Sequence, residues 1–197
     1  MALNPQGYFN CLKSYLHHDD YGVQQSITGA VVLKEKIHKA QGERPKEFKV
    51  TLATEGDLIV IKLDGRKDRL FHFLDDTAKP WSKRCDFVIF NLRKSKLYAY
   101  CVEFKSTNIP PDVPDQLASS VAWCKALHAT IKAYTGKKMQ LNVSKYVFSE
   151  HEIDGSPYLD GDSKYLKRDH TIRHYHYAEL SGMALANLDN SNIEVIR

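Results

Sequence analysis

The stretch CDFVIFNLRKSKLYAYCVEFKS, residues 85–106, constrains the fold more than any other part of the chain. Two apolar runs flank a short, basic, polar turn, which is the pattern of a buried antiparallel hairpin. Charged residues nevertheless stand at both of its ends: Asp86 begins the first run, and Glu103 and Lys105 end the second. Because a buried charge costs several kcal/mol unless it is paired or coordinated, these residues need a chemical reason to be there.

The geometry of a strand predicts which of these charges meet. Residues two apart in a strand project to the same face, so Glu103 and Lys105 point the same way. The antiparallel pairing of the hairpin is expected to bring Asp86 near Glu103. Two carboxylates that close repel each other, and a divalent cation between them removes the repulsion. A small set of hard oxygen ligands suits Mg²⁺ or Mn²⁺, with the other ligands coming from water and a phosphate.

Hydrophobic periodicity predicts the elements on either side of this hairpin. Helical spacing indicates a short helix over 6–18, a longer helix over 28–41 and another over 115–135. Alternating or apolar runs indicate further strands at 48–52, 58–63, 70–74, 145–149 and in the terminal IEVI. This order predicts an α/β fold, in which a mixed β-sheet with an antiparallel meander is flanked by helices.

Length and composition set the expected organisation. A chain of 197 residues with 43% hydrophobic and 26% charged residues is enough for one domain with a proper core. We expect a single domain 1–197, with its core at about 28–150, an N-terminal helical extension at 1–27 and a C-terminal elaboration at 150–197. The net charge of +4 is compatible with a polyanionic partner but does not require one.

The sequence also indicates the compartment. No apolar run approaches the length of a membrane span, and the first residues lack the pattern of a signal peptide. The four cysteines form no CxxC pair and no metal-ligand spacing, which is typical of reduced thiols in the cytosol. We therefore expect a soluble cytoplasmic protein with no membrane partner.

The charged residues of the hairpin resemble a known signature. Asp86 is followed, after sixteen residues, by Glu103-Phe104-Lys105 at the end of an apolar strand. This pattern resembles the D…(D/E)xK signature of the PD-(D/E)XK nuclease superfamily, whose restriction-endonuclease-like core is a helix, a three-stranded meander, a helix and a further strand. The resemblance covers roughly residues 28–150. It departs from the family in having Cys85 where a proline often precedes the aspartate, and in a longer predicted meander.

The resemblance implies a metal-dependent nuclease that hydrolyses phosphodiester bonds, in DNA rather than RNA, with Mg²⁺ or Mn²⁺ as its cofactor. It implies that Asp86, Glu103 and the backbone carbonyl of Phe104 hold the metal. Lys105 would orient or deprotonate the attacking water, or stabilise charge on the phosphate.

The resemblance also suggests further site residues. Several family branches place a glutamine on the helix after the lysine strand, and Gln116 matches this position as a contact to the phosphate or the water. Branches often carry an acid on the first helix, for which Glu35 is the candidate metal ligand. Basic residues of the C-terminal segment are candidates for phosphate contacts. They are Lys164, Lys167, Arg168 and Arg173.

Two alternatives to this interpretation stay open at this point. Glu103 and Lys105 could form an ordinary ion pair that faces solvent at a strand end. The chain could also be a catalytically inactive nuclease-fold protein that binds nucleic acid or assembles with another protein, although the presence of all three signature residues favours an enzyme. No helix-turn-helix or zinc finger is visible, so we expect any sequence specificity to come from a homodimer or a partner protein.

Overall fold

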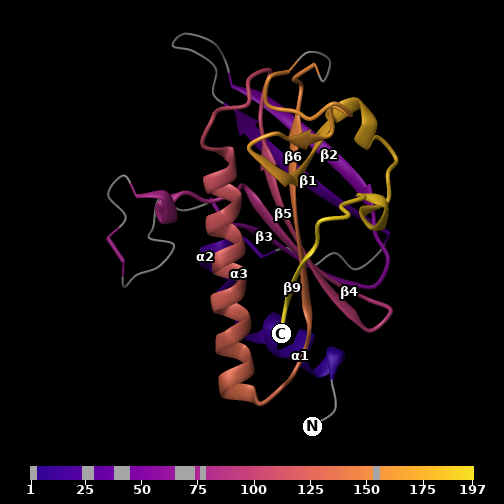
Figure 1. Ribbon diagram of the computed structural model, residues 1–197. Helices are drawn as coiled ribbons and strands as arrows, with labels where there is room; N and C mark the ends of the chain where they lie inside the picture. Colours follow the sequence, from indigo (N-terminus) through magenta and orange to yellow (C-terminus); the bar gives the residue numbers. More distant parts are fainter. Residues whose placement is uncertain (1–3, 24–28, 38–44, 65–73, 76–78, 153–155) are drawn as a thin grey trace.

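The computed structural model describes residues 4–23, 29–37, 45–64, 74–75, 79–152 and 156–197. Its main sheet has seven strands in the order β3-β4-β5-β6-β8-β7, with β9 paired to β6, and β1 and β2 form a separate two-stranded sheet (Figure 1). Strands β3, β4 and β5 are an antiparallel meander, whereas β6 runs parallel to both β5 and β8. The predicted α/β class with a mixed sheet is therefore confirmed.

The helices and strands span these residues. The α-helices are α1 (Pro5–Tyr15), α2 (His18–Tyr21) and α3 (Val113–Thr135), and short 3₁₀ helices are η1 (Pro80–Ser82), η2 (Tyr177–Leu180) and η3 (Leu185–Asn187). The strands are β1 (Ala30–Ile37), β2 (Lys46–Ala53), β3 (Asp57–Lys62), β4 (Phe87–Arg93), β5 (Lys96–Phe104), β6 (Leu141–Ser149), β7 (Tyr165–Leu166), β8 (Asp169–His176) and β9 (Glu194–Ile196).

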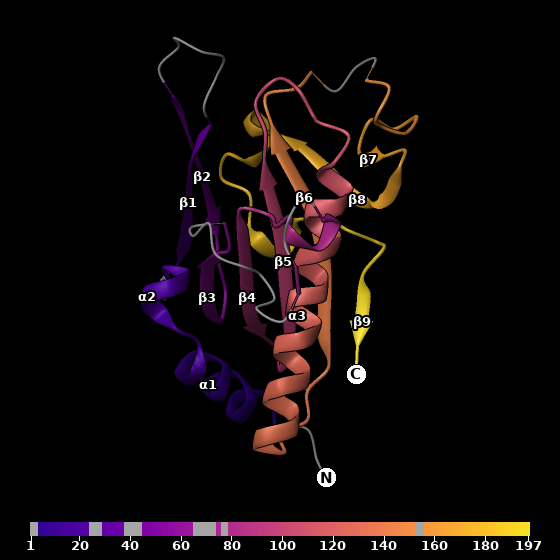
Figure 2. The same ribbon diagram turned by 90° about the vertical axis from the view of Figure 1, so that its left-hand side faces the viewer.

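Helices cover one face of the main sheet. Helix α3 contacts β5 and β6, and α1 contacts both α3 and β4 (Figures 1 and 2). The two helices bury Leu117 and Cys124 of α3 and Phe9 and Leu12 of α1 in one apolar cluster with this face. Helix α1 therefore belongs to the packed core.

The other face of the main sheet is covered by β1 and β2, which we call the ribbon. Its inward side chains alternate with exposed ones, as expected for strands with one buried face. Leu33 of β1 and Val50 of β2 lie in a second apolar cluster together with Val60, Phe87 and Ile89 of the main sheet. The molecule thus has three layers, with the main sheet between helices and the ribbon.

The predicted helix over 28–41 is wrong, because the described part of this segment is strand β1. Both periodicities fit the sequence, since Val32, Leu33 and Ile37 have helical spacing while Val31, Leu33 and Ile37 alternate. Antiparallel pairing with β2 decides between them, because it buries the alternating set against the sheet. The helix that precedes the meander is α1 instead.

The other predicted elements have clear outcomes. The helices over 6–18 and 115–135, the hairpin at 85–106 and the strands at 48–52, 58–63, 145–149 and in the terminal IEVI are confirmed, within a few residues at their ends. The predicted strand at 70–74 lies outside the described residues, apart from Leu74. Strands β8 and β9, from the predicted C-terminal elaboration, both pair with β6 of the main sheet.

In the parts of the chain described here, no helix is long and apolar enough to cross a membrane.

Candidate metal and phosphate site

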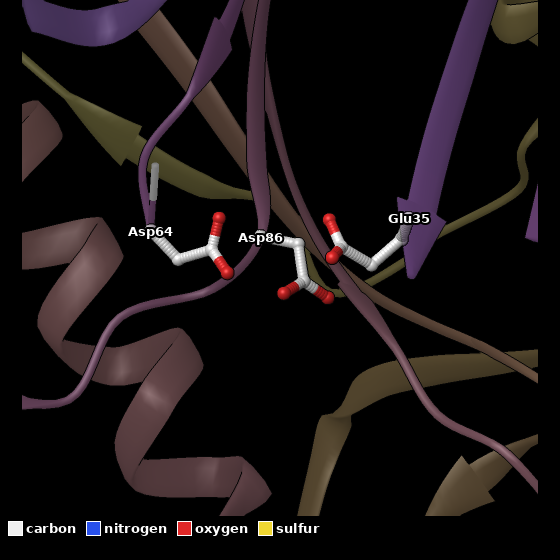
Figure 3. A group of neighbouring side chains, drawn as sticks. All are labelled: Glu35, Asp64 and Asp86. Carbon is white, nitrogen blue, oxygen red and sulfur yellow. The ribbon is translucent and has the colours of Figure 1, made fainter. Parts of the chain in front are cut away.

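Three carboxylates meet at the end of the main sheet, where the ribbon lies against it. Glu35, Asp64 and Asp86 each offer an oxygen, and these oxygens all lie within 4.8 Å of one another. Glu35 belongs to β1, Asp64 lies two residues beyond the end of β3, and Asp86 directly precedes β4. Figure 3 shows the Asp86 carboxylate between the other two.

Strand pairing explains why Asp64 and Asp86 are neighbours. The β3–β4 ladder continues beyond the strands, because the N–H of Leu63 donates to the carbonyl of Asp86 at 2.8 Å. Asp64 follows Leu63 directly and so reaches Asp86. Glu35 belongs to the ribbon. The alternation of β1 puts its side chain on the buried face of the strand and leaves the residue 9% exposed.

Asp86 is held by the hairpin and by α3. Its Oδ2 accepts a hydrogen bond of 2.5 Å from the N–H of Phe104, which ties it to the end of β5. The N–H of Cys85 donates to Ser120 Oγ at 2.8 Å, and Ser120 Oγ donates to the carbonyl of Gln116 at 2.8 Å. The carboxylate therefore has a fixed position between two layers of the fold.

Glu103 and Lys105 form an ion pair beside this group. Lys105 Nζ contacts Glu103 Oε1, and the Glu103 side chain is 2% exposed. The interpretation of these residues as a solvent-facing pair is therefore wrong. The backbone of Lys105 is fixed on both sides, since its N–H donates to the carbonyl of Phe148 at 2.8 Å and its carbonyl accepts from Tyr177 Oη at 2.9 Å.

Two residues of the site were missed by the sequence reasoning. Asp64 belongs to the group of three carboxylates, and Lys62 Nζ lies 2.8 Å from Glu35 Oε2. A signal for them was present, because Lys62-Leu63-Asp64 ends an apolar strand with a lysine and an acid two residues apart. This is the same arrangement as Glu103-Phe104-Lys105, in reverse order.

Burial and mutual repulsion shift the pKa values of the acids upward. Burial, followed by the charges of Glu103 and Asp64, raises the pKa of Asp86 well above its ordinary value. Burial and then Glu35 raise the pKa of Asp64. Burial raises the pKa of Glu103 to about 7, against the opposing effect of Lys105. A cation placed among such carboxylates stabilises their charged forms.

The Lys105 ammonium stays charged at neutral pH. Burial by itself would lower the pKa of this lysine, but the nearby Glu103 carboxylate outweighs burial, so the pKa lies above its ordinary value. Lys105 can therefore donate hydrogen bonds and offer positive charge, and it does not offer a free lone pair.

The donor set fits a hard divalent cation. Among the described residues, no hydrogen-bond donor reaches Asp64 Oδ1, Glu103 Oε2 or Gln116 Oε1, although all three atoms are buried. Buried oxygens without partners are uncommon in folded proteins and call for a ligand. Mg²⁺ and Mn²⁺ prefer carboxylate and carbonyl oxygens, so Glu35, Asp64 and Asp86 suit such an ion. The predicted ligand Glu103 is not part of this group of three, although its charge acts on Asp86.

The structure brings most of the predicted site residues together. Glu35 lies in the carboxylate group, although it reaches it from a strand. Phe104 contacts Asp86 through its N–H, and the predicted role of its carbonyl stays a prediction. Gln116 begins α3 and is linked to Cys85 through Ser120.

The predicted phosphate contacts differ among themselves. Arg173 is 9% exposed, and its guanidinium lies 3.1 Å from Tyr165 Oη and 3.5 Å from Asp189 Oδ2. The guanidinium of Arg173 therefore binds groups of the fold itself. Arg168 is exposed and donates to the carbonyl of Pro111 at 2.5 Å, while Lys167 is exposed and Lys164 is half-buried.

No protein-family model, curated protein or solved structure gives a significant match to this chain. The geometry of the site therefore carries the functional assignment.

Proposed function

We propose that this protein is a metal-dependent nuclease that hydrolyses phosphodiester bonds, with a restriction-endonuclease-like core formed by α1, the meander β3–β5, α3 and β6. The observation that carries the proposal is the meeting of Glu35, Asp64 and Asp86 within 4.8 Å, next to the buried Glu103–Lys105 pair. Carboxylates that hold a divalent cation, with an ammonium beside them, can stabilise the charge that develops in phosphodiester hydrolysis.

Each residue has a role in this proposal. Glu35, Asp64 and Asp86 would hold Mg²⁺ or Mn²⁺, and Glu103 Oε2 would add a further oxygen. The bound cation would supply positive charge to the phosphate oxygens and lower the pKa of water. Lys105 would stabilise the negative charge that develops on the phosphate, since Glu103 keeps it protonated.

The attacking water needs a fixed position in line with the leaving oxygen. The unpartnered Oε1 of Gln116 is an acceptor at the start of α3, and it would hold this water by accepting a hydrogen bond from it. Attack forms a new bond from the water oxygen to phosphorus and breaks the bond to the leaving sugar oxygen. The net products are a phosphate monoester and an alcohol.

The substrate is proposed to be DNA, with a second copy of the chain or a partner protein supplying any sequence specificity. This part rests on the resemblance to the PD-(D/E)XK superfamily alone. The net charge of +4 is consistent with a polyanionic substrate.

The test is cleavage of supercoiled plasmid, linear DNA and single-stranded RNA, with EDTA or with Mg²⁺ or Mn²⁺. We expect the wild type to cut only with metal, and both Asp86→Asn and Lys105→Ala to lose at least about 10²-fold in rate. Lys145→Met is the matched control, because Lys145 forms a similarly buried ion pair at 2.6 Å with Asp169, which is not one of the site's carboxylates. Cleavage that survives in both site variants would refute the proposal. Binding of DNA without cleavage would favour the inactive, nucleic-acid-binding alternative.

A further inference from the structure

Lys62 is the second lysine of the site, and the proposed reaction gives it no role. Its Nζ lies 2.8 Å from Glu35 Oε2, and its side chain is 39% exposed while that of Glu35 is 11% exposed. The ion pair joins β3 of the main sheet to β1 of the ribbon. A further contact of the Glu35 carboxylate is local, because Oε1 accepts from the N–H of Lys36 at 3.0 Å.

The site needs a counter-charge when it holds no divalent cation. Three carboxylates within 4.8 Å repel one another strongly in a partly buried place. Lys105 is already bound to Glu103. Lys62 supplies a counter-charge, because its ammonium forms an ion pair with a member of the carboxylate group.

Lys62 is also placed so that it can leave. Its ammonium lies 5.7 Å from the centre of the Phe87 ring, and a flexible four-carbon stem carries it. Because this side chain is far more exposed than Lys105, its ammonium regains hydration when it leaves the carboxylate. Only the lysine side of this pair is open to water, so the pair lies between fully exposed ion pairs and fully buried ones.

We propose that Lys62 is a displaceable counter-ion: it neutralises Glu35 while the site lacks a divalent cation, and it gives up this ion pair when Mg²⁺ or Mn²⁺ binds. The inference rests on the proposed function only in taking the carboxylate group as the cation site. Lys62 therefore competes with the cation, in contrast to Lys105, which works beside it.

The test is calorimetric titration of metal-stripped protein with Mn²⁺ alone, for the wild type, Lys62→Met and Lys62→Arg. We expect Lys62→Met to bind Mn²⁺ about tenfold more tightly, a gain of about 1.4 kcal/mol, because the competing charge is gone. Lys62→Arg keeps the charge and should stay close to the wild type. The melting temperature without metal should fall in Lys62→Met, and saturating Mn²⁺ should narrow this difference.

A second pair of variants separates competition from a general change in the fold. In the background of Glu35→Gln, the added Lys62→Met change should no longer tighten Mn²⁺ binding, because its partner is already lost. Equal or weaker Mn²⁺ affinity in Lys62→Met, or the same tightening in the Glu35→Gln background, would overturn the inference.

The outcomes also separate this inference from the proposed nuclease activity. A wild type that binds Mn²⁺ but cuts no nucleic acid would remove the activity and leave the role of Lys62 intact. A wild type that cuts nucleic acid, together with a Lys62→Met variant whose Mn²⁺ affinity is unchanged, would support the nuclease activity and overturn the role of Lys62. A wild type that binds no Mn²⁺ would overturn both.

Discussion

The site has two halves that differ in how they are built. The ribbon half consists of Glu35 of β1 and of Lys62 and Asp64, which meet it from the end of β3 and just beyond. The hairpin half consists of Asp86 just before β4 and of Glu103 and Lys105 at the end of β5. Both halves pair a lysine with an acid. In the ribbon half the lysine side chain is 39% exposed, and in the hairpin half it is 18% exposed.

This difference separates two uses of the same chemical pair. A lysine that is open to water leaves its partner at lower cost than a buried one, because the ammonium regains hydration when it leaves. A buried pair cannot do so, since removing one partner of such a pair costs about 3–5 kcal/mol. The ribbon half is therefore suited to respond to a cation, and the hairpin half is suited to hold a fixed positive charge at the reacting phosphate.

The largest expected effect compares the two lysines directly. Lys105→Met should lower metal-dependent cleavage by about 10²–10³-fold, because the charge that stabilises the phosphate is lost. Lys62→Met should change the rate at saturating metal by less than about tenfold. Cleavage rates at saturating Mn²⁺ check this, with Lys145→Met as the control that removes an ion pair elsewhere. If Lys105→Met and Lys62→Met lose cleavage rate equally, the two lysines do not have the different roles proposed for them.

The pH dependence of stability should come from the buried acids. The native pKa of Glu103 is raised from 4.5 to about 7, so the folded protein binds more protons than the unfolded chain between these values. Its contribution to stability is therefore complete at low pH and is lost as the pH rises through this window, at up to about 1.4 kcal/mol per pH unit.

Denaturant unfolding in EDTA across this pH range measures the effect. The pKa values of Asp64 and Asp86 are also raised, so these residues should make the free energy of unfolding fall more steeply with pH. Glu103→Gln should make the slope shallower. A stability that increases with pH in the wild type, or a slope unchanged by the substitution, would show that folding does not raise the pKa of Glu103.

A smaller effect is expected at the backbone support of the hairpin half. Tyr177→Phe removes the hydrogen bond to the carbonyl of Lys105, and Tyr146→Phe removes a similar bond of 3.0 Å to the carbonyl of Leu188. Both should lose about 1 kcal/mol of stability. Cleavage should fall in Tyr177→Phe alone, because this tyrosine positions Lys105. If the two variants retain equal activity, the position of Lys105 does not depend on Tyr177.

The smallest effect is expected at the exposed basic residues outside both halves. Lys167→Ala and Arg168→Ala should each weaken DNA binding. Each should also reduce the slope of the logarithm of the binding constant against the logarithm of the salt concentration by about one. Arg173→Ala should instead lower the free energy of unfolding, since its guanidinium is bound to Tyr165 and lies near Asp189. Binding isotherms at several salt concentrations, with denaturant unfolding in parallel, distinguish the two outcomes.

The sequence by itself determined the hairpin half of the site. Periodicity along 85–106 predicted two paired strands, and the two-residue repeat of a strand placed Glu103 and Lys105 on one face. The turn between the strands fixes their register, so Asp86 had to lie near Glu103. These relations are local, and few alternative arrangements satisfy them.

The tertiary structure decided how the ribbon half is built. The segment around Glu35 fits a helix or a strand, and pairing with β2 chose the strand because it buries Leu33 against the main sheet. Asp64 joins Asp86 only because the β3–β4 ladder continues for one more bond. Contacts between segments distant in sequence depend on how whole layers pack, and no local pattern records that packing. The hairpin half could therefore be found from the order of the residues, whereas the place of Asp64 beside Asp86 and the strand that carries Glu35 could not.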